Sequence, residues 1–193
     1  MARKYELKKR AERQQDTRRR IVEAVVELHR TIGPARTTVA AIAEQAGVER
    51  KTFYRHFPDP NGIFEACSAH YRSLHPPPDP HAWAEVADPE ERLRHALPAA
   101  YGYYREHEAM MDNVLRDREL GVPVGEGFLR HRAAMKGVLA EGWKPRHRTR
   151  FEAALDVALD FRVWQTLARA GLADEEAVDL MAGLVASAAR AQR

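Results

Sequence analysis

The residues best suited to specific chemistry lie between Thr37 and Phe57, in the segment TTVAAIAEQAGVERKTFYRHF. Six of the seven residues from 50 to 56 are polar or cationic: Arg50, Lys51, Thr52, Tyr54, Arg55 and His56. Arg and Lys side chains donate to guanine O6 and N7, and Thr can contact a base edge or a thymine methyl group. Tyr and His suit phosphate oxygens, which position a helix without specifying sequence. This stretch therefore predicts a surface that recognises double-stranded DNA.

These side chains require a short helix held at a sharp angle against a second one, and the same segment supplies that arrangement. Gly47 tolerates the positive φ of a tight corner, and Ala43 and Ala46 allow the two helices to cross closely. The predicted inner face consists of Ile42, Val48, Phe53 and Phe57. The alternative is an ordinary amphipathic helix with a solvated face, which the aromatic residues and histidine among the cations disfavour.

The charge of the chain is unevenly divided. Residues 1–57 hold 14 Lys and Arg against 7 Asp and Glu, whereas the remaining residues hold 17 against 21. The stretch from Arg3 to Arg20 alone holds 9 basic against 3 acidic residues. We interpret residues 1–15 as a mobile arm or a helix extension, which either reaches DNA or is a solubilising tail.

Along the whole chain, apolar spacing predicts an all-α fold of about nine helices, and no strand-like period extends beyond a few residues. The expected helices cover about 17–32, 38–46, 50–57, 61–74, 89–106, 108–118, 126–142, 146–170 and 174–192. The run His75-Pro76-Pro77-Pro78-Asp79-Pro80 is the clearest break between two helical blocks.

The segment from about Thr17 to Tyr71 resembles the DNA-binding domain of tetracycline-repressor (TetR) family regulators. The matching runs are Thr37-Thr38, Ile42-Ala43-Glu44, Ala46-Gly47-Val48 and Thr52-Phe53-Tyr54-Arg55-His56-Phe57-Pro58. The resemblance implies a basic arm (1–15), a helix-turn-helix domain (16–60) with a connecting fourth helix (61–74), and a ligand-binding and dimerisation domain (75–193). It implies a regulator, usually a repressor, that binds a palindromic operator as a homodimer and is released by a small hydrophobic effector.

Carried over by position, the resemblance implies base contacts from Arg50, Lys51 and Thr52. Phosphate contacts are implied for Thr37, Thr38, Tyr54 and His56, and we include Arg55 in the same surface. Two positions depart from the family pattern. Glu49 stands where a Ser or Thr usually caps the recognition helix, and Pro60 stands where a Lys often holds a phosphate, a contact that Asn61 could replace.

A homodimer is expected because a single helix-turn-helix reads only a few base pairs. The last two predicted helices carry apolar stripes, and the resemblance implies that such helices form a four-helix interface. The candidate interface residues are Phe151, Leu155, Leu159, Trp164, Val178, Met181, Leu184 and Val185. The alternative is that these stripes fill the core within one chain.

An effector pocket is expected among the helices of the second block and the fourth helix. Its candidate residues combine apolar surface with hydroxyl groups: Phe64, Tyr71, Tyr101, Tyr104, Met110, Met111 and Phe128. Methionine and aromatic side chains adapt well to hydrophobic ligands, although such stripes also form ordinary core.

Other functions are less well supported. His70, His75 and His81 near Cys67 suggest a metal-responsive regulator, but their spacing matches no standard zinc pattern. A nonspecific nucleoid-associated protein is the other alternative. Glu106-His107-Glu108 lacks the second His of a zinc protease, and no phosphate loop or nucleophile elbow occurs, so we expect no enzyme, cofactor or metal.

The single cysteine and the absence of a signal peptide or apolar span predict a cytoplasmic protein at the nucleoid, without membrane contact.

Overall fold

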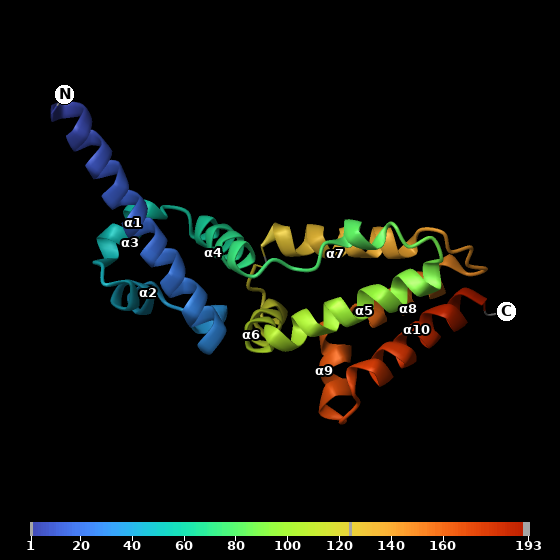
Figure 1. The fold of residues 1–193 in the computed structure, drawn as a ribbon. Helices are drawn as coiled ribbons and strands as arrows, with labels where there is room; N and C mark the ends of the chain where they lie inside the picture. The colour runs from blue at the N-terminus through green and yellow to red at the C-terminus, as the bar shows by residue number, and fades with distance from the viewer. Residues whose placement is uncertain (1, 124, 191–193) are drawn as a thin grey trace. The chain divides into compact units, whose positions relative to one another are not determined.

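Ten α-helices and two short 3₁₀-helices form the regular structure of residues 2–123 and 125–190, the part of the chain that the computed structural model describes (Figure 1). The 3₁₀-helices are η1 (Pro34–Arg36) and η2 (Pro80–Trp83). The α-helices are α1 (Ala2–Thr31), α2 (Val39–Ala46), α3 (Arg50–His56), α4 (Pro60–Leu74), α5 (Pro89–Glu106), α6 (Glu108–Glu119), α7 (Glu126–Ala140), α8 (Arg148–Ala158), α9 (Phe161–Arg169) and α10 (Asp174–Arg190). No strand occurs among these residues, so the all-α prediction is confirmed.

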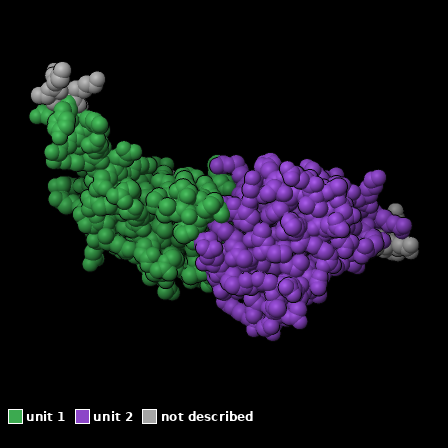
Figure 2. All heavy atoms as spheres, viewed as in Figure 1, with its two compact units in different colours: residues 1–76, 109–128 green, residues 77–108, 129–193 purple. Residues whose placement is uncertain are grey.

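The chain divides into two compact units, drawn in green and purple in Figure 2. Unit 1 comprises residues 1–76 and 109–128, and unit 2 comprises residues 77–108 and 129–193. The proline-rich run lies at the first crossing between them. The return of 109–128 to unit 1 was not expected from the sequence, and it places α6 with the helix-turn-helix.

The first helix begins much earlier than its capping signals suggested, so residues 2–15 are a helix extension. Asp16 and Thr17 were expected to start it, but both lie inside it. The Thr17 hydroxyl donates to the Arg13 carbonyl oxygen over 2.9 Å, and Asp16 pairs with Arg19 over 2.7 Å. Both side chains are satisfied by neighbours on the same helix, and the helix continues through them.

Unit 1 is built around the second half of α1, against which α2 and α4 pack. Its core joins apolar residues from the first four helices: Ile21, Val22, Ala24, Val25, Ile42, Ala46, Phe53, Phe57, Ile63 and Cys67. The three members from the predicted inner face, Ile42, Phe53 and Phe57, are all buried. Their burial fixes which side of α3 faces outward.

Unit 2 packs α5, α8 and α10 together, with α9 against them. One helix expected over 146–170 is instead two, because the chain breaks at Leu159 and Asp160. Asp160 caps α9 by accepting from the backbone N–H groups of Arg162 (2.8 Å) and Val163 (3.2 Å). This break accounts for ten helices where about nine were predicted.

Two buried tyrosines on α5 stabilise that break. The Tyr101 hydroxyl donates to the Ala158 carbonyl oxygen over 2.9 Å, and the Tyr104 hydroxyl donates to that of Leu159 over 2.8 Å. Carbonyl groups at a helix C-terminus have no partner within the helix. The tyrosines therefore satisfy the end of α8. Within the described residues, no helix has both the length and the apolar composition that a membrane span requires.

Candidate DNA-binding surface and ligand cavity

The corner between α2 and α3 has the geometry of a helix-turn-helix. Gly47 adopts φ 64° and ψ 42°, and its N–H group donates to carbonyl oxygens at the end of α2. A residue with a Cβ atom is strained in this left-handed region, which explains the glycine. Arg20 of α1 donates from Nη1 to the Ala46 carbonyl oxygen over 2.9 Å, so α1 caps α2 and ties the corner down.

The outer face of α3 carries the predicted recognition residues. Arg50, Lys51, Tyr54 and Arg55 are exposed, whereas Thr52 and His56 are half-buried. Phe53, between them, is buried and contacts the ring of Phe57 at a centroid distance of 5.8 Å. The packed aromatic face thus holds three cationic side chains outward on two turns of helix.

Two of the predicted recognition residues are less available for contact: His56 is half-buried, and Lys51 pairs with a neighbouring carboxylate. Burial, followed by the charges of Arg55 and Arg18, lowers the pKa of His56, and its buried Nε2 has no hydrogen-bond partner among the described residues. Glu49 stands at the N-cap of α3, makes no capping hydrogen bond there, and pairs with Lys51 over 2.7 Å. The Glu49 carboxylate therefore offsets part of the positive charge of Lys51, whose ammonium group has further donors for other partners.

The two threonines before α2 are already engaged in local structure. Thr38 caps α2 by accepting from the Ala41 N–H over 3.2 Å, and the Thr37 hydroxyl donates to the Gly33 carbonyl oxygen over 2.8 Å. The side chains of Pro60 and Asn61 are not among those that the structure describes, so the phosphate contact predicted for Asn61 stays a prediction.

Comparison with known proteins identifies this surface. A family model described as "Bacterial regulatory proteins, tetR family" matches residues 21–67, which include the whole helix-turn-helix. Residues 21–67 therefore form a helix-turn-helix DNA-binding domain of the tetR type, and the chain is similar to transcriptional regulators of that family. No curated protein sequence gives a match.

Several solved structures are similar to this chain at low identity. A TetR-like transcriptional regulator from Rhodococcus sp. RHA1 is 20% identical, with a TM-score of 0.58, and the match covers 89% of this chain and 94% of the other. A second TetR regulator from the same organism is 19% identical, with a TM-score of 0.48 and coverage of 90% and 96%. RolR in complex with resorcinol is 16% identical, with a TM-score of 0.47 and coverage of 92% and 90%.

Unit 1 of the regulator also contains a cavity of about 110 Å³ between α1, α4 and the 109–128 segment. Most of its lining is apolar: Val26, Pro34, Phe64, Met110, Met111, Val114, Leu115, Pro123 and Phe128. Its polar lining groups are those of His29, Cys67, Ser68 and Tyr71. Five of the predicted pocket residues meet here: Phe64, Tyr71, Met110, Met111 and Phe128. No pattern in the sequence indicated that His29, on the first helix, would also line the cavity.

Tyr101 and Tyr104 do not line this cavity. Both belong to unit 2 and are buried, and their hydroxyl groups are used at the end of α8. Burial raises the pKa of Tyr104 to about 12, so its hydroxyl stays protonated and acts as a donor.

The polar groups of the cavity are uncharged at neutral pH. Burial lowers the pKa of His29 to about 4, against a smaller opposing effect of the Asp117 charge, and raises the pKa of Cys67 to about 12. The Cys67 Sγ lies 3.7 Å from His29 Nδ1, and the His29 ring stacks on Phe64 at 5.7 Å. The cavity therefore suits an uncharged ligand better than an ion.

One helix, α6, lines this cavity and also holds the corner between α1 and α2. The Asp117 Oδ2 accepts from the Ala35 N–H over 2.8 Å, and Asn113 donates from Nδ2 to the Arg30 carbonyl oxygen over 2.7 Å. Arg116 pairs with Asp117 over 2.8 Å. We call Asn113, Arg116 and Asp117 the α6 clamp.

The α6 clamp packs so closely against the backbone of Gly33 that there is no room for a side chain at this position. Gly33 adopts φ 90°, and a Cβ atom there would collide with the carboxylate of Asp117 and the guanidinium of Arg116. Burial alone would raise the pKa of Asp117, but hydrogen bonds from Arg116 and Ala35 outweigh it and hold the pKa below its ordinary value. Asp117 is thus a buried carboxylate at neutral pH.

Most of the predicted dimer residues are core residues of unit 2. The buried ones are Phe151, Leu155, Leu159, Trp164, Val178, Met181 and Val185. These residues are buried within one chain, as the alternative held, and their role in a dimer stays a prediction. Leu184 is the exception, because its side chain is 40% exposed. Two other apolar side chains of unit 2 are also exposed, Leu180 on α10 (50%) and Val157 on α8 (39%).

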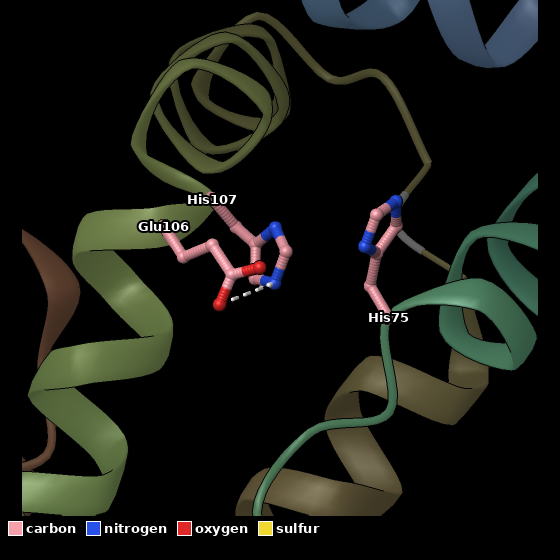
Figure 3. Close-up of side chains that lie close together, drawn as sticks. All are labelled: His75, Glu106 and His107. Atoms are coloured by element: carbon pink, nitrogen blue, oxygen red, sulfur yellow. Dashed lines mark ion pairs between the residues drawn. The ribbon is translucent and has the colours of Figure 1, made fainter.

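The histidines proposed for a metal site are not gathered around Cys67. Among the described residues, the one group of three candidate ligands comprises His75, Glu106 and His107, drawn in Figure 3. His75 belongs to unit 1 and the other two to unit 2. Within unit 2, Glu106 Oε2 and His107 Nε2 lie 4.0 Å apart, the pair that the dashed line marks. We assign no metal site to them.

Proposed function

We propose that this regulator recognises a palindromic operator as a homodimer by placing α3 of each protomer in the major groove. The observation that carries the proposal is the division of α3 into two faces. Phe53 is anchored in the core, while Arg50, Lys51 and Arg55 face outward at the end of a glycine corner. In this arrangement Arg50 and Lys51 donate to base edges, and Tyr54 and Arg55 hold phosphates.

Selection of bound sequences from a random pool of duplex DNA tests this proposal. We expect a palindrome whose half-sites are about 10 base pairs apart, because two symmetric recognition helices meet the groove one turn apart. A nonspecific nucleoid protein would instead enrich no motif and would bind all duplexes with similar salt dependence. Such a result would reject sequence-specific regulation.

We infer that the two protomers meet through an exposed stripe on unit 2, formed by Val157, Leu180 and Leu184. These side chains are apolar and solvent-exposed in one chain, and Gly183 beside them leaves space for close approach. Leu180→Glu with Leu184→Glu is expected to give a monomer by light scattering. Leu120→Glu with Leu129→Glu, two exposed leucines outside this stripe, is the matched control with the same change in net charge. A dimer that survives the leucine changes would contradict this interface.

We further propose that the regulator is a repressor released by a small, uncharged, hydrophobic effector bound in the unit 1 cavity. An apolar cavity of roughly 150 Å³ accommodates benzene. The cavity of about 110 Å³ is smaller, so it accepts one small ring when the flexible side chains of Met110 and Met111 move aside. His29 and Tyr71 supply hydrogen-bonding groups for a hydroxyl or carbonyl on that ring.

The α6 clamp provides a physical route from this cavity to the DNA-binding helices. Met110, Met111, Val114 and Leu115 face the cavity, and Asp117 on the same helix holds η1 just before α2. A ligand that displaces α6 must strain or break the clamp, which shifts the position of α2 and α3. Only differential binding to the two conformations can produce release.

Neutral one-ring aromatic compounds, beginning with phenol, are the probes for this effector site. We expect some of them to raise the unfolding temperature of the wild type and to release operator DNA. Met111→Trp, which fills the cavity, should abolish both effects while leaving DNA binding intact. Binding that persists in the filled variant would place the effector elsewhere.

A further inference from the structure

The first half of α1 is a helical arm that no other described part of the chain covers. We define the arm as residues 5–16, whose side chains the structure describes except for that of Leu7. Each of these described side chains is exposed, and Tyr5 is exposed to 67%. In Figure 1 the arm, in dark blue, extends beyond α2 and α3. Helices in proteins are usually held by an apolar face against a core, and this part has no such contact.

The direction of the arm relative to α3 is fixed by Arg18. Its Nη1 donates to the His56 carbonyl oxygen over 2.9 Å, and its guanidinium lies over the Phe57 ring at 4.1 Å from the centroid. Arg18 therefore attaches α1 to the C-terminal end of α3. At 3.6 residues per turn, Lys9, Arg13 and Arg10 lie within one arc of about 100° on the arm, a stripe that begins about 80° around the helix from Arg18.

The arm carries positive charge that is not neutralised internally. Glu12 pairs with Lys8 over 3.9 Å, and Asp16 pairs with Arg19 and Arg20. No ion pair within the described part of the chain involves Lys9, Arg10 or Arg13. Three cations on an uncovered helix next to the recognition helix are complementary to a phosphate backbone.

We propose that the arm binds the phosphate backbone of duplex DNA beyond the half-site that α3 contacts, chiefly through Lys9, Arg10 and Arg13. This inference rests on the proposed placement of α3 in the major groove. A helix rises about 1.5 Å per residue, so the twelve residues of the arm span roughly 18 Å. Since DNA rises 3.4 Å per base pair, the arm reaches about five base pairs of flanking sequence.

The arm also lacks the features that stabilise an isolated helix. The first turn of α1, which precedes the arm, holds no acidic residue to offset the helix dipole, and the described side chains of the arm are all exposed. Phosphates along its side supply the missing counter-charge. Binding of flanked operator is therefore expected to protect the arm amides from hydrogen exchange.

The decisive comparison uses the full chain and the operator obtained by selection, with and without ten flanking base pairs on each side. In the arm variant, Lys9, Arg10 and Arg13 are all changed to Gln, which keeps helix propensity while removing three charges. The control variant changes Lys144, Arg146 and Arg150 of unit 2 to Gln, with the same change in net charge. Circular dichroism establishes that both variants are folded.

The wild type is expected to bind flanked operator more tightly than trimmed operator, and the arm variant to bind both equally. The slope of log affinity against log salt should fall by roughly 3 per protomer in the arm variant, at about 0.9 per lost phosphate contact. The control should retain the wild-type slope. Hydrogen exchange of the arm in wild-type protein gives a second measurement that needs no variant.

Equal slopes in the arm and control variants, together with unprotected arm amides in the bound wild type, would overturn the proposal. Failure of the proposed function looks different, because the wild type would then select no operator. A wild type that binds its operator but ignores the flanks rejects the arm alone.

Discussion

The α6 clamp is expected to be the most sensitive single contact of unit 1, and Asp117→Asn tests it with almost no change in side-chain volume. Asp117 is buried and accepts hydrogen bonds from the Ala35 N–H (2.8 Å) and from Arg116 Nε (2.8 Å). An amide offers one acceptor oxygen and turns the other position into a donor. One of the two donors must therefore lose its partner inside the fold.

The cost follows from the burial of these groups. Loss of a hydrogen bond to a charged group costs about 1.5 to 3 kcal/mol when the other group stays buried. For a chain of this size each kcal/mol lowers the midpoint by roughly 2 to 4 °C, so the expected decrease is about 3 to 12 °C. Thermal unfolding followed by circular dichroism measures it, with Glu119→Gln, exposed on the same helix, as the control.

The pH dependence gives this prediction its sign. The folded pKa of Asp117 lies below its ordinary value of 3.8, so the carboxylate stabilises the fold above that pH. This stabilisation is lost as the pH falls through the folded pKa. Wild type and Asp117→Asn should therefore differ fully at pH 7 and converge in acid. Equal midpoints of the two proteins at pH 7 would refute the clamp as a stabilising contact.

Two further predictions concern buried polar groups. The pKa of His29 is about 4 in the folded protein, against an ordinary value of 6.5. Between these two pH values the imidazole is protonated in the unfolded chain but not in the folded one, so the free energy of unfolding falls as the pH drops from 6.5 towards 4. Urea unfolding should show that wild type loses about 2 kcal/mol more than His29→Phe between pH 7 and pH 5, whereas parallel pH profiles would contradict this. Tyr104→Phe should cost about 1 to 3 kcal/mol, because the Leu159 carbonyl oxygen loses its donor inside the core. Tyr5→Phe, at an exposed position, is its control, and an equal effect of the two would show that the hydrogen bond contributes nothing.

The sequence was informative where local rules decide the structure. The positive φ of Gly47 and the burial of Phe53 and Phe57 follow from a tight corner and an apolar period, and both could be predicted. The outward cationic face of α3 follows from the same pattern. These features depend on residues within about one turn of each other.

Features that depend on distant contacts were missed. Asp117 and Ala35 are 82 residues apart, so no local pattern connects α6 with the corner before α2. The apolar stripe through residues 151–167 is continuous, and it hid the break at Leu159. Asp160 was the available signal, because an Asp side chain that accepts from the following N–H groups begins a helix.

The residues predicted for the dimer interface show a related difficulty. An apolar stripe does not reveal whether its partner is the same chain or a second copy. Phe151, Leu155 and Val185 are used within unit 2, and the exposed residues Leu180 and Val157 were not singled out. Periodicity identifies a buried face, but the three-dimensional packing decides what buries it.

The central claim is that the outer face of α3 contacts operator DNA, and the affinity of Arg50→Glu/Lys51→Glu for the selected duplex tests it most directly. Lys144→Glu/Arg146→Glu is the matched control, with the same change in net charge at exposed positions of unit 2. Specific binding exceeds nonspecific binding by roughly a thousandfold or more, and we expect the α3 variant to lose that margin while the control keeps it. Undiminished operator affinity in a folded α3 variant would contradict the account.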